Sequence, residues 1–506
     1  MKKIILILSM VLIHGLTLCM AQNEAVIKVD VERRIGQIDN LMYSSFAEHL
    51  GRCVYQGIYD PASPESDANG FRTDVIKAIR ELNVPLVRWP GGNFASGYHW
   101  TDGIGPKEKR PVRMDLAWGK REDNSFGTDE FMAWCHQAGV IPYFCVNLGT
   151  GTAEEAHNWV EYCNVDGGTY YSDLRARNGH KEPYKIIYWG LGNEVDGPWQ
   201  IGHKNAEDYS KAALETAKVM KWVDKDIKLI AAGCSNYGAD WVNWNRTVIN
   251  TLGDHADYIS LHNYVSNNTD DYYRYMASTD FADNVIKVTK GLILEAQISN
   301  KLHHPLYIAF DEYNASYNTK GHGGAHDTFN LEDALCVASY LNAFVRHADI
   351  VRMTNMAQIV NLLGPIATTN EKTWRQTIFY PLQLFANNCF GQSLSLSVST
   401  PVYKIDNADQ PYVDASAAFN PDKKTVVVNV VNRHKEQVMP LTLVDQNDIW
   451  GKKATACIVN GKTTKSMNTP AEENVKTRSQ AVEIKNGKIK FPLEPHSFTQ
   501  FIISLR

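Results

Sequence analysis

Short apolar runs alternate with helical patterns between about residues 40 and 385. The runs that predict β-strands are Met42–Phe46, Leu86–Trp89, Tyr143–Val146, Ile186–Trp189, Lys228–Ala232, Tyr258–Leu261, Leu306–Phe310 and Val351–Thr354. The intervening patterns that predict helices include Asp74–Leu82, Thr128–Ala138, Ala206–Lys221 and Leu331–His347. Strands that alternate with helices predict a parallel sheet, and this many units favour closure into a (β/α)8 barrel. A doubly wound open sheet is the alternative, but no GxGxxG motif follows the first strand.

The texture of the chain changes after about residue 386. Short β-rich runs, separated by Asn, Asp, Gly and Pro, include Leu394–Val398, Thr425–Val431, Val482–Ile484 and Phe498–Ser504. This pattern predicts an antiparallel β-sandwich with a jelly-roll-like arrangement. We therefore expect the barrel over residues 40–385, the sandwich over residues 386–506, and residues 22–39 as an N-terminal strand that pairs with the sandwich. No low-complexity linker separates the two domains, so they should pack firmly.

The amino terminus has the pattern of a secretory signal. Met1-Lys2-Lys3 precedes an apolar stretch that runs from Ile4 to about Leu18. We expect cleavage after Ala21, which makes residues 1–21 a signal peptide and the location periplasmic or extracellular. A lipid anchor on Cys19 is the alternative, although Leu18 is large for that signal. No other stretch is apolar over the length of a membrane span.

Composition narrows the possible functions of the 506-residue chain. Hydrophobic residues make up 44% and charged residues 21%, so a packed core is expected and wholesale disorder is not. The net charge is −5, and the absence of a basic stripe argues against a nucleic-acid partner. Eight cysteines outside the signal show no dense framework, and we expect scattered buried thiols. Four tryptophans near Gly/Pro-rich loops are candidates for stacking on a sugar ring: Trp89, Trp100, Trp118 and Trp199.

Polar residues follow most of the predicted barrel strands. These groups are Glu48-His49, Arg88 to Asn93, Asn147, Asn193-Glu194, His262 to Tyr264, Asp311-Glu312 and Gln358. Each group alone is more often a helix cap, a turn or a structural ion pair. Together they predict one rim lined with hydrogen-bonding groups, which suits a polyol substrate. Glu194 and Glu312 both end buried strands, and two carboxylates brought together across a barrel are typical of a glycoside hydrolase.

Other kinds of site find less support. A nucleotide site would need GxxxxGK[ST], and a serine hydrolase would need GxSxG, but neither motif is present. Residues Gly321 to Asp327 contain two histidines and an aspartate. They lie in a Gly-rich run without an HExxH helix, which favours a mobile substrate-contact loop over a zinc site. We predict neither a metal nor a cofactor.

Several motifs resemble the family 51 α-L-arabinofuranosidases, which are retaining glycoside hydrolases. The resemblance rests on Phe46 to Arg52, Arg88 to Phe94, Gly192 to His203, Asp311 to Asn314, Asn330 to Leu335 and Ala357 to Asn361. It spans almost the whole chain after the signal, and the stretch around Glu194 is its most specific part. Val195 stands where the family usually has Met, and Tyr313 where it usually has Trp.

The resemblance implies a role for each site residue. Glu194 becomes the general acid/base and Glu312 the nucleophile. Arg88 and Tyr264 would favour the ionised form of Glu312, whose charge should raise the pKa of Glu194. The resemblance assigns the sugar hydroxyls to Glu48, Asn93, Asn193 and Gln358. It also places His262 beside the catalytic pair and Trp100 on the leaving-group side.

The first functional hypothesis is therefore an exo-acting retaining α-L-arabinofuranosidase. Its substrates would be arabinan, arabinoxylan or their oligosaccharides, cleaved at terminal α-L-arabinofuranosyl residues. An endo-glucanase or β-xylosidase would use the same carboxylate pair and stays open as an alternative. A non-catalytic carbohydrate-binding barrel is a further alternative from another class. The family resemblance also implies a homo-oligomer, with a hexamer as the expected assembly.

Overall fold

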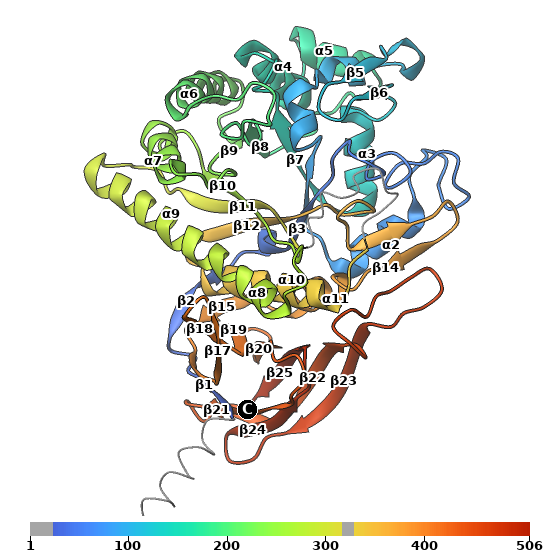
Figure 1. Cartoon of the computed structure of the whole chain (residues 1–506). Helices are drawn as coiled ribbons and strands as arrows, with labels where there is room; N and C mark the ends of the chain where they lie inside the picture. The colour runs from blue at the N-terminus through green and yellow to red at the C-terminus, as the bar shows by residue number, and fades with distance from the viewer. Residues whose placement is uncertain (1–23, 316–327) are drawn as a thin grey trace, which may run out of the picture.

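Eight parallel strands form a closed barrel at the centre of the larger domain (Figure 1). The computed structural model describes residues 24–315 and 328–506. The barrel strands are β3 (Ser44–Phe46), β4 (Leu86–Trp89), β7 (Ile141–Val146), β8 (Tyr188–Leu191), β9 (Lys228–Ala231), β10 (Tyr258–Tyr264), β11 (Tyr307–Asn314) and β12 (Val351–Ala357). Each strand pairs with its successor and β12 returns to β3, so the predicted barrel is confirmed and the open sheet is excluded.

Helices surround the barrel and return the chain between its strands. They are α2 (Thr73–Leu82), α3 (Thr128–Ala138), α4 (Ala153–Asn164), α5 (Tyr170–Arg177), α6 (Ala206–Val223), α7 (Trp241–Leu252), α8 (Tyr272–Ser278), α9 (Asp280–Ser299), α10 (Leu331–Arg346) and α11 (Phe379–Asn388). Side-chain caps begin several of them, with Thr152 accepting from the Glu155 amide and Asn205 from the Asp208 amide. Such caps fix where each helix starts, and therefore how long each strand-to-helix loop is.

The lower part of the barrel is a packed core. Leu86, Tyr143, Ile230, Ala309 and Met353 belong to one buried cluster at this level. Side chains from facing strands fill the interior of a (β/α)8 barrel, so it is not a pore. A pocket lies at the opposite end, where the strands finish.

The smaller domain is a sandwich of two sheets (Figure 1). One sheet has the order β2-β15-β19-β20-β25-β22-β23 and the other β16-β1-β21-β24. The bounds are β1 (Ala25–Val29), β2 (Arg34–Ile38), β15 (Gly391–Leu394), β16 (Ser397–Ser399), β19 (Val413–Asn420), β20 (Thr425–Asn432), β21 (Met439–Asp445), β22 (Trp450–Asn460), β23 (Lys476–Glu483), β24 (Lys488–Leu493) and β25 (Ser497–Leu505). The first strand, β1, lies between β16 and β21. The predicted sandwich is confirmed.

Partly buried ionic contacts join the two domains through α10. Arg346, near the end of this helix, places Nη1 2.7 Å from Asp414 of β19 and Nη2 2.6 Å from Asp283 of α9. The side chain of Asn342 also donates to Asp414 at 2.8 Å. Asp414 therefore connects the sandwich to two side chains of α10, through an ion pair and a hydrogen bond.

Three small hairpins complete the described structure. They are β5 (Arg113–Asp115) with β6 (Lys120–Glu122), β13 (Ile366–Thr368) with β14 (Thr373–Arg375), and β17 (Val402–Ile405) with β18 (Ala408–Pro411). The sequence patterns did not predict them, because each strand is only a few residues long. The eight cysteines of the described residues are buried and free, which confirms the prediction of scattered thiols.

Two predicted features fall outside the description. The signal peptide over residues 1–21 and the loop from Gly321 to Asp327 both lie outside the described residues. Among the helices of the described ranges, none combines the length and the apolar character needed to cross a membrane.

Candidate active site

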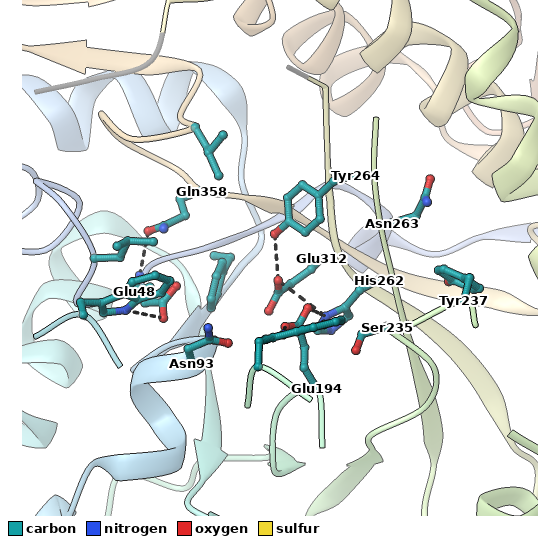
Figure 2. Close-up of a pocket in the computed structure, with 16 residues that line it drawn as sticks. Glu48, Asn93, Glu194, Ser235, Tyr237, His262, Asn263, Tyr264, Glu312 and Gln358 are labelled. Atoms are coloured by element: carbon teal, nitrogen blue, oxygen red, sulfur yellow. Dashed lines mark hydrogen bonds and ion pairs between the residues drawn. The ribbon is translucent and has the colours of Figure 1, made fainter. Parts of the chain in front are cut away.

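A pocket of about 410 Å³ lies at the carboxyl ends of the barrel strands (Figure 2). Seven predicted site residues line it: Glu48, Asn93, Glu194, His262, Tyr264, Glu312 and Gln358. The other lining residues are Phe46, Leu50, Gly92, Trp118, Trp199, Ser235, Tyr237, Asn263 and Leu363. Glu194 and Glu312 are 118 residues apart in the chain, and the barrel brings them to the same cavity.

Glu312 is buried and held by two donors. Arg88 of β4 places Nη1 2.7 Å from one carboxylate oxygen, and the hydroxyl of Tyr264 donates to the other at 2.8 Å. Both contacts stabilise the ionised carboxylate. They also fix its orientation toward the pocket, as Figure 2 shows for Tyr264.

An irregularity in β11 allows Asp311 and Glu312 to serve one site. Ser260 of β10 pairs with Ala309, but His262 pairs with Glu312, so β11 has one more residue than β10 across this step. In a regular strand two consecutive side chains would point to opposite faces. The extra residue re-aims the backbone, as β-bulges commonly do beside active sites. Both acidic side chains consequently contact His262.

Glu194 is held in an unusual backbone conformation just after β8. Its φ is 45°, in the left-handed region that costs a non-glycine residue roughly 1–3 kcal/mol. Gly192, two residues earlier, has a φ of 84° and supplies the turn that a side chain would hinder. The Glu194 carboxylate accepts from Trp199 Nε1 at 2.7 Å and lies 2.9 Å from His262 Nδ1. The turn therefore aims the carboxylate at the pocket and at His262.

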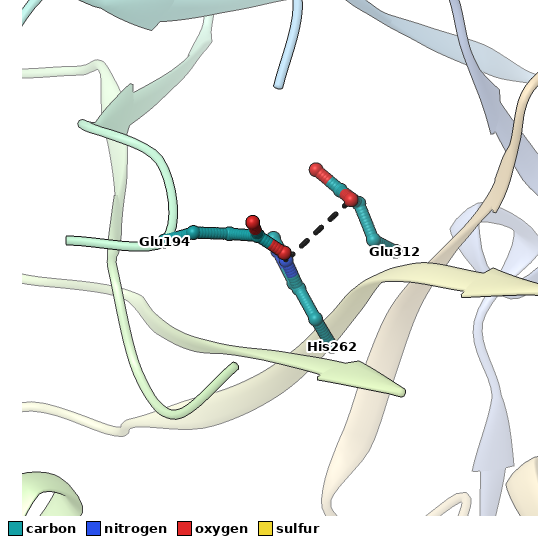
Figure 3. A group of neighbouring side chains, drawn as sticks. All are labelled: Glu194, His262 and Glu312. Atoms are coloured by element: carbon teal, nitrogen blue, oxygen red, sulfur yellow. Dashed lines mark hydrogen bonds and ion pairs between the residues drawn. The ribbon is translucent and has the colours of Figure 1, made fainter. Parts of the chain in front are cut away.

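His262 joins the acidic groups of the site (Figure 3). Its Nδ1 lies 2.9 Å from Glu194 and 3.6 Å from Glu312, and its Nε2 lies 3.3 Å from Asp311. Burial lowers the pKa of His262, but these three carboxylates outweigh burial and raise it to about 10. His262, Glu194 and Glu312 are close enough to ligate one metal ion.

Asp311 is the buried acidic partner of both Arg88 and the His262 imidazolium. It lies 3.8 Å from Arg88 Nε and accepts hydrogen bonds from Ser260 and from Tyr143, the latter at 2.8 Å. Burial raises the pKa of Asp311, but Arg88, His262 and Ser260 outweigh burial and lower it to about 2. Asp311 is therefore ionised at neutral pH and holds His262 in the charged form.

The pKa values of the two glutamates shift in directions that the sequence did not predict. Burial raises the pKa of both. For Glu194, the hydrogen bonds from His262 and Trp199 and the positive charge of His262 outweigh burial and lower the pKa. For Glu312 burial and the charge of Glu194 outweigh the opposing contributions of His262, Arg88 and Tyr264, and its pKa is raised. The predicted rise for Glu194 omitted the imidazolium beside it.

Glu48 lies on the opposite side of the pocket, after β3. Its carboxyl group accepts from the Phe94 amide at 3.0 Å and from Trp118 Nε1 at 3.2 Å. Its own backbone amide donates to the Gln358 side chain at 3.1 Å, which ties β3 to β12. Burial raises the pKa of Glu48 to about 8. A protonated carboxyl here can donate as well as accept a hydrogen bond.

Arg88 and Asn193 lie behind the lining rather than in it. Arg88 Nη2 donates to Asn193 Oδ1 at 2.6 Å. The Asn193 Nδ2 group is buried and has no partner among the described residues. A buried donor without a partner is costly. It is the kind of group that a bound ligand would satisfy.

The structure corrects the prediction for Trp100. This side chain is only 2% exposed and does not line the pocket. Its ring stacks on Trp159 and packs against Tyr162, while its N–H donates to the Glu155 carbonyl oxygen. Trp89 is buried as well. Of the four tryptophans predicted to stack on a sugar, Trp118 and Trp199 line the pocket.

The sequence patterns did not predict a role for several residues that the structure brings into the site. Ser235 and Tyr237 follow β9, and their loop is held by Asp196, which accepts from the amides of Ser235 and Asn236 at 2.8 Å. The signal for Asp311 was its place directly before Glu312. The signal for Asp196 was its place in the motif after Glu194.

We expect Asp311→Asn to lower the pKa of His262, because the variant removes a buried negative charge 3.3 Å from Nε2. In the wild type the imidazolium stabilises the fold below pH 6.5, and this contribution is lost as the pH rises through about 10. NMR titration of ¹⁵N-labelled histidine, with His262→Gln for assignment, measures the pKa. An unchanged His262 titration in Asp311→Asn would contradict this account.

The fold and the pocket define a class of protein. A (β/α)8 barrel with two carboxyl groups in one pocket at the carboxyl ends of its strands is the architecture of a barrel glycoside hydrolase. Polar side chains around the pair suit a hydroxyl-rich substrate. The comparisons with known proteins narrow this class.

Two family models match the chain. The α-L-arabinofuranosidase 1 domain matches residues 78–283, and the α-L-arabinofuranosidase C-terminal domain matches residues 311–497. The intracellular exo-α-(1→5)-L-arabinofuranosidase 1 of Bacillus subtilis is 43% identical over 424 residues, covering 81% of this chain and 85% of the relative. The solved family 51 α-L-arabinofuranosidase AbfB from Bifidobacterium longum is 32% identical with a TM-score of 0.90, and the match covers 95% of this chain and all of the other. The chain belongs to the family 51 α-L-arabinofuranosidases and is a glycoside hydrolase.

The names of the relatives correct the predicted location. The Bacillus subtilis enzyme is named intracellular. So is the exo-α-(1→5)-L-arabinofuranosidase of Halalkalibacterium halodurans, which is 42% identical over 82% of this chain and 86% of its own length. The prediction of a periplasmic or extracellular protein is therefore wrong. That prediction rested on residues 1–21 alone.

Proposed function

We propose that this enzyme removes terminal α-L-arabinofuranosyl residues with retention of configuration, through a covalent intermediate on Glu312. The observation that carries the proposal is the spacing of the carboxyl groups. One oxygen of Glu194, one oxygen of Glu312 and a ring nitrogen of His262 all lie within 4.8 Å of one another. Retaining pairs stand about 5–5.5 Å apart, whereas inverting pairs stand roughly 6.5–9.5 Å apart to admit a water.

Glu312 attacks the anomeric carbon, and its carboxylate is held ready by Arg88 and Tyr264. Positive charge develops on the sugar in the transition state, and this favours the ionised form of Glu312 against the effect of burial. Glu194 protonates the leaving oxygen in the first step. It then removes a proton from the water that releases the sugar in the second step.

Substrate binding has to place a proton on Glu194, because His262 and Trp199 lower the pKa of this carboxyl group. We expect the leaving oxygen to approach the Glu194 carboxylate on the side where Trp199 donates. When the leaving oxygen replaces this donor, one of the contacts that lower the pKa of Glu194 is lost, and exclusion of water raises the pKa further. Glu194 and Glu312 titrate as a pair, and the first step requires that the pair carry one proton at Glu194.

The remaining polar groups hold the sugar hydroxyls. Glu48, Asn93 and Gln358 line the pocket opposite the catalytic pair. Asn193 offers the unpartnered buried N–H described above. Each hydrogen bond lost to a buried group costs on the order of 1–3 kcal/mol, so these contacts select a furanose that matches them.

The substrate class follows from the relatives. Both bacterial relatives are named exo-α-(1→5)-L-arabinofuranosidases, which supports terminal residues of α-(1→5)-linked arabinan oligosaccharides as substrates here. Arabinoxylan side chains are a second candidate. The endo-glucanase and β-xylosidase alternatives are not favoured, because the relatives carry neither name. A non-catalytic barrel is disfavoured because both glutamates are present and share a pocket.

A panel of substrates tests the proposal. We expect hydrolysis of an aryl α-L-arabinofuranoside and of linear α-(1→5)-arabino-oligosaccharides, with arabinose as the first product. ¹H NMR of the early reaction should show α-L-arabinofuranose before it mutarotates. Release of the β-anomer first would exclude a retaining mechanism, and shortened chains without arabinose would exclude exo action.

Two further points stay proposals. We propose the division into residues 22–39, 40–385 and 386–506, supported by the sheet in which β1 lies beside sandwich strands. We also propose a homo-oligomer, with the hexamer that the family resemblance favours. Light scattering coupled to size-exclusion chromatography measures the assembly directly.

A further inference from the structure

We infer that His49 is a positioning residue for the sugar pocket. Through Glu122, it fixes the β5–β6 hairpin so that the Trp118 N–H stays on Glu48. The inference rests on the proposed role of Glu48 in sugar binding. It assigns a function to His49, which follows Glu48 in the chain. His49 itself does not line the pocket.

The hydrogen bonds of His49 determine its tautomer. Trp89 Nε1 is a donor only, and it donates to His49 Nε2 at 3.1 Å. Nε2 must therefore be the unprotonated nitrogen, and Nδ1 carries the N–H. His49 Nδ1 lies 3.2 Å from Glu122 Oε2 and donates to it. The imidazole also stacks on Phe94, with ring centroids 4.5 Å apart, so its plane is fixed.

Glu122 receives this bond at the base of the hairpin. It also accepts from the hydroxyl of Tyr55 and from the Asn124 amide at 2.8 Å. Burial disfavours the ionised form of Glu122, whereas the hydrogen bonds from His49, Tyr55 and Asn124 favour it. Three donors on one buried carboxylate hold the last residue of β6 in place.

The tip of the hairpin carries Trp118 to the pocket. Asp115, the last residue of β5, shapes the turn by accepting from the Ala117 amide at 2.9 Å and the Trp118 amide at 3.4 Å. The Trp118 ring packs against a cluster that contains Leu50 and Leu363. Its N–H donates to Glu48 Oε1 at 3.2 Å.

These contacts form a closed circuit. It runs from Glu48 to Trp118, along β6 to Glu122, across to His49, and back to Glu48 through one peptide bond. A shift of the hairpin would break the bond to Glu48 and displace the aromatic wall of the pocket. Freezing one arrangement before the sugar binds removes an ordering cost from binding, so the circuit favours affinity.

A surface contact on the same hairpin supplies a matched control. Arg113 of β5 pairs with Asp102 at 2.8 Å, but its side chain is 62% exposed. Exposed ion pairs contribute little. Arg113→Gln should therefore leave KM unchanged, although it removes a hairpin contact just as a change at His49 does.

The test is a double-mutant cycle on an aryl α-L-arabinofuranoside with His49→Phe, Trp118→Phe and the double variant. His49→Phe keeps the stacking on Phe94 and removes both hydrogen bonds. We expect it to raise KM about tenfold, with a smaller change in kcat, since one buried hydrogen bond is at stake. If His49 acts through Trp118, the double variant should match Trp118→Phe alone. Glu122→Gln gives a second entry to the cycle if His49→Phe does not fold, as judged by circular dichroism.

The outcomes separate the inference from the proposed function. Additive effects of His49→Phe and Trp118→Phe on KM would overturn the inference. So would an unchanged KM in both His49→Phe and Glu122→Gln when Trp118→Phe raises it. An unchanged KM in Trp118→Phe, together with an unchanged KM in Glu48→Gln, would instead remove the sugar-binding role of Glu48, and the inference with it.

Discussion

Replacing Glu312 with Ala is expected to lower kcat by roughly 10⁴-fold or more, a loss of the size seen when a covalent nucleophile is removed. Arg88 and Tyr264 donate hydrogen bonds to the carboxylate, so they orient the nucleophile and stabilise its charge, and the variant leaves both donors without it. The loss should fall on kcat more than on KM, because the missing interaction exists mainly in the transition state. Initial rates on an aryl α-L-arabinofuranoside measure it.

Azide gives the Glu312 experiment a stereochemical readout. The small anion can occupy the space left by the carboxylate and attack the sugar from the same side. A single displacement inverts the centre, so the product should be a β-L-arabinofuranosyl azide. Glu215→Ala, at an exposed helix position, is the control and should keep wild-type rates. Substantial turnover by Glu312→Ala without azide would mean that the nucleophile lies elsewhere.

Much of the fold could be predicted because its periodic signals are local. The helix over Thr128–Ala138 has the predicted bounds, and Leu331–Arg346 differs by one residue. The buried barrel strands are continuous apolar runs, as expected when both faces are covered. The polar residues at their ends therefore fell on one rim, and this placed Glu194 and Glu312 in one pocket.

The details that set the chemistry depend on contacts between distant residues. A strict two-residue alternation would separate Asp311 from Glu312, and only the pairing of β11 with β10 reveals the extra residue. Trp100 and Trp118 lie in similar Gly-rich stretches of sequence. One is buried against Trp159 and the other reaches Glu48, because the β5–β6 hairpin folds back over the pocket.

The predicted direction of the pKa shift at Glu194 was wrong for the same reason, because it depends on contacts between distant residues. The sequence prediction counted the negative charge of Glu312 and left out the positive charge of His262. That charge exists because Asp311, from the neighbouring strand, faces the other ring nitrogen at 3.3 Å. The pKa values of Glu194 and Glu312 thus depend on a third carboxylate, Asp311. Its place in the motif could be read from the sequence, but its contact with His262 could not.

Glu194→Ala should show losses that depend on the leaving group. An arabinan oligosaccharide needs its leaving oxygen protonated, so its kcat/KM should fall by roughly 10²–10⁴-fold. Dinitrophenolate departs from a dinitrophenyl arabinofuranoside without a proton, so the rate of the first step should be nearly preserved with this substrate. The second step then lacks a base, and the glycosyl-enzyme should accumulate. Stopped-flow absorbance should record a burst of dinitrophenolate followed by slow turnover.

Azide again identifies the role of the missing group. It needs no base, so it should restore turnover of the dinitrophenyl substrate in Glu194→Ala. The azide attacks the intermediate held on Glu312, and the second inversion gives an α-L-arabinofuranosyl azide of retained configuration. Glu194→Gln should behave alike, since an amide neither donates an acidic proton nor accepts one from water. A β-configured azide from either Glu194 variant would exchange the roles of the two glutamates, because only the residue that forms the covalent bond can be bypassed with inversion.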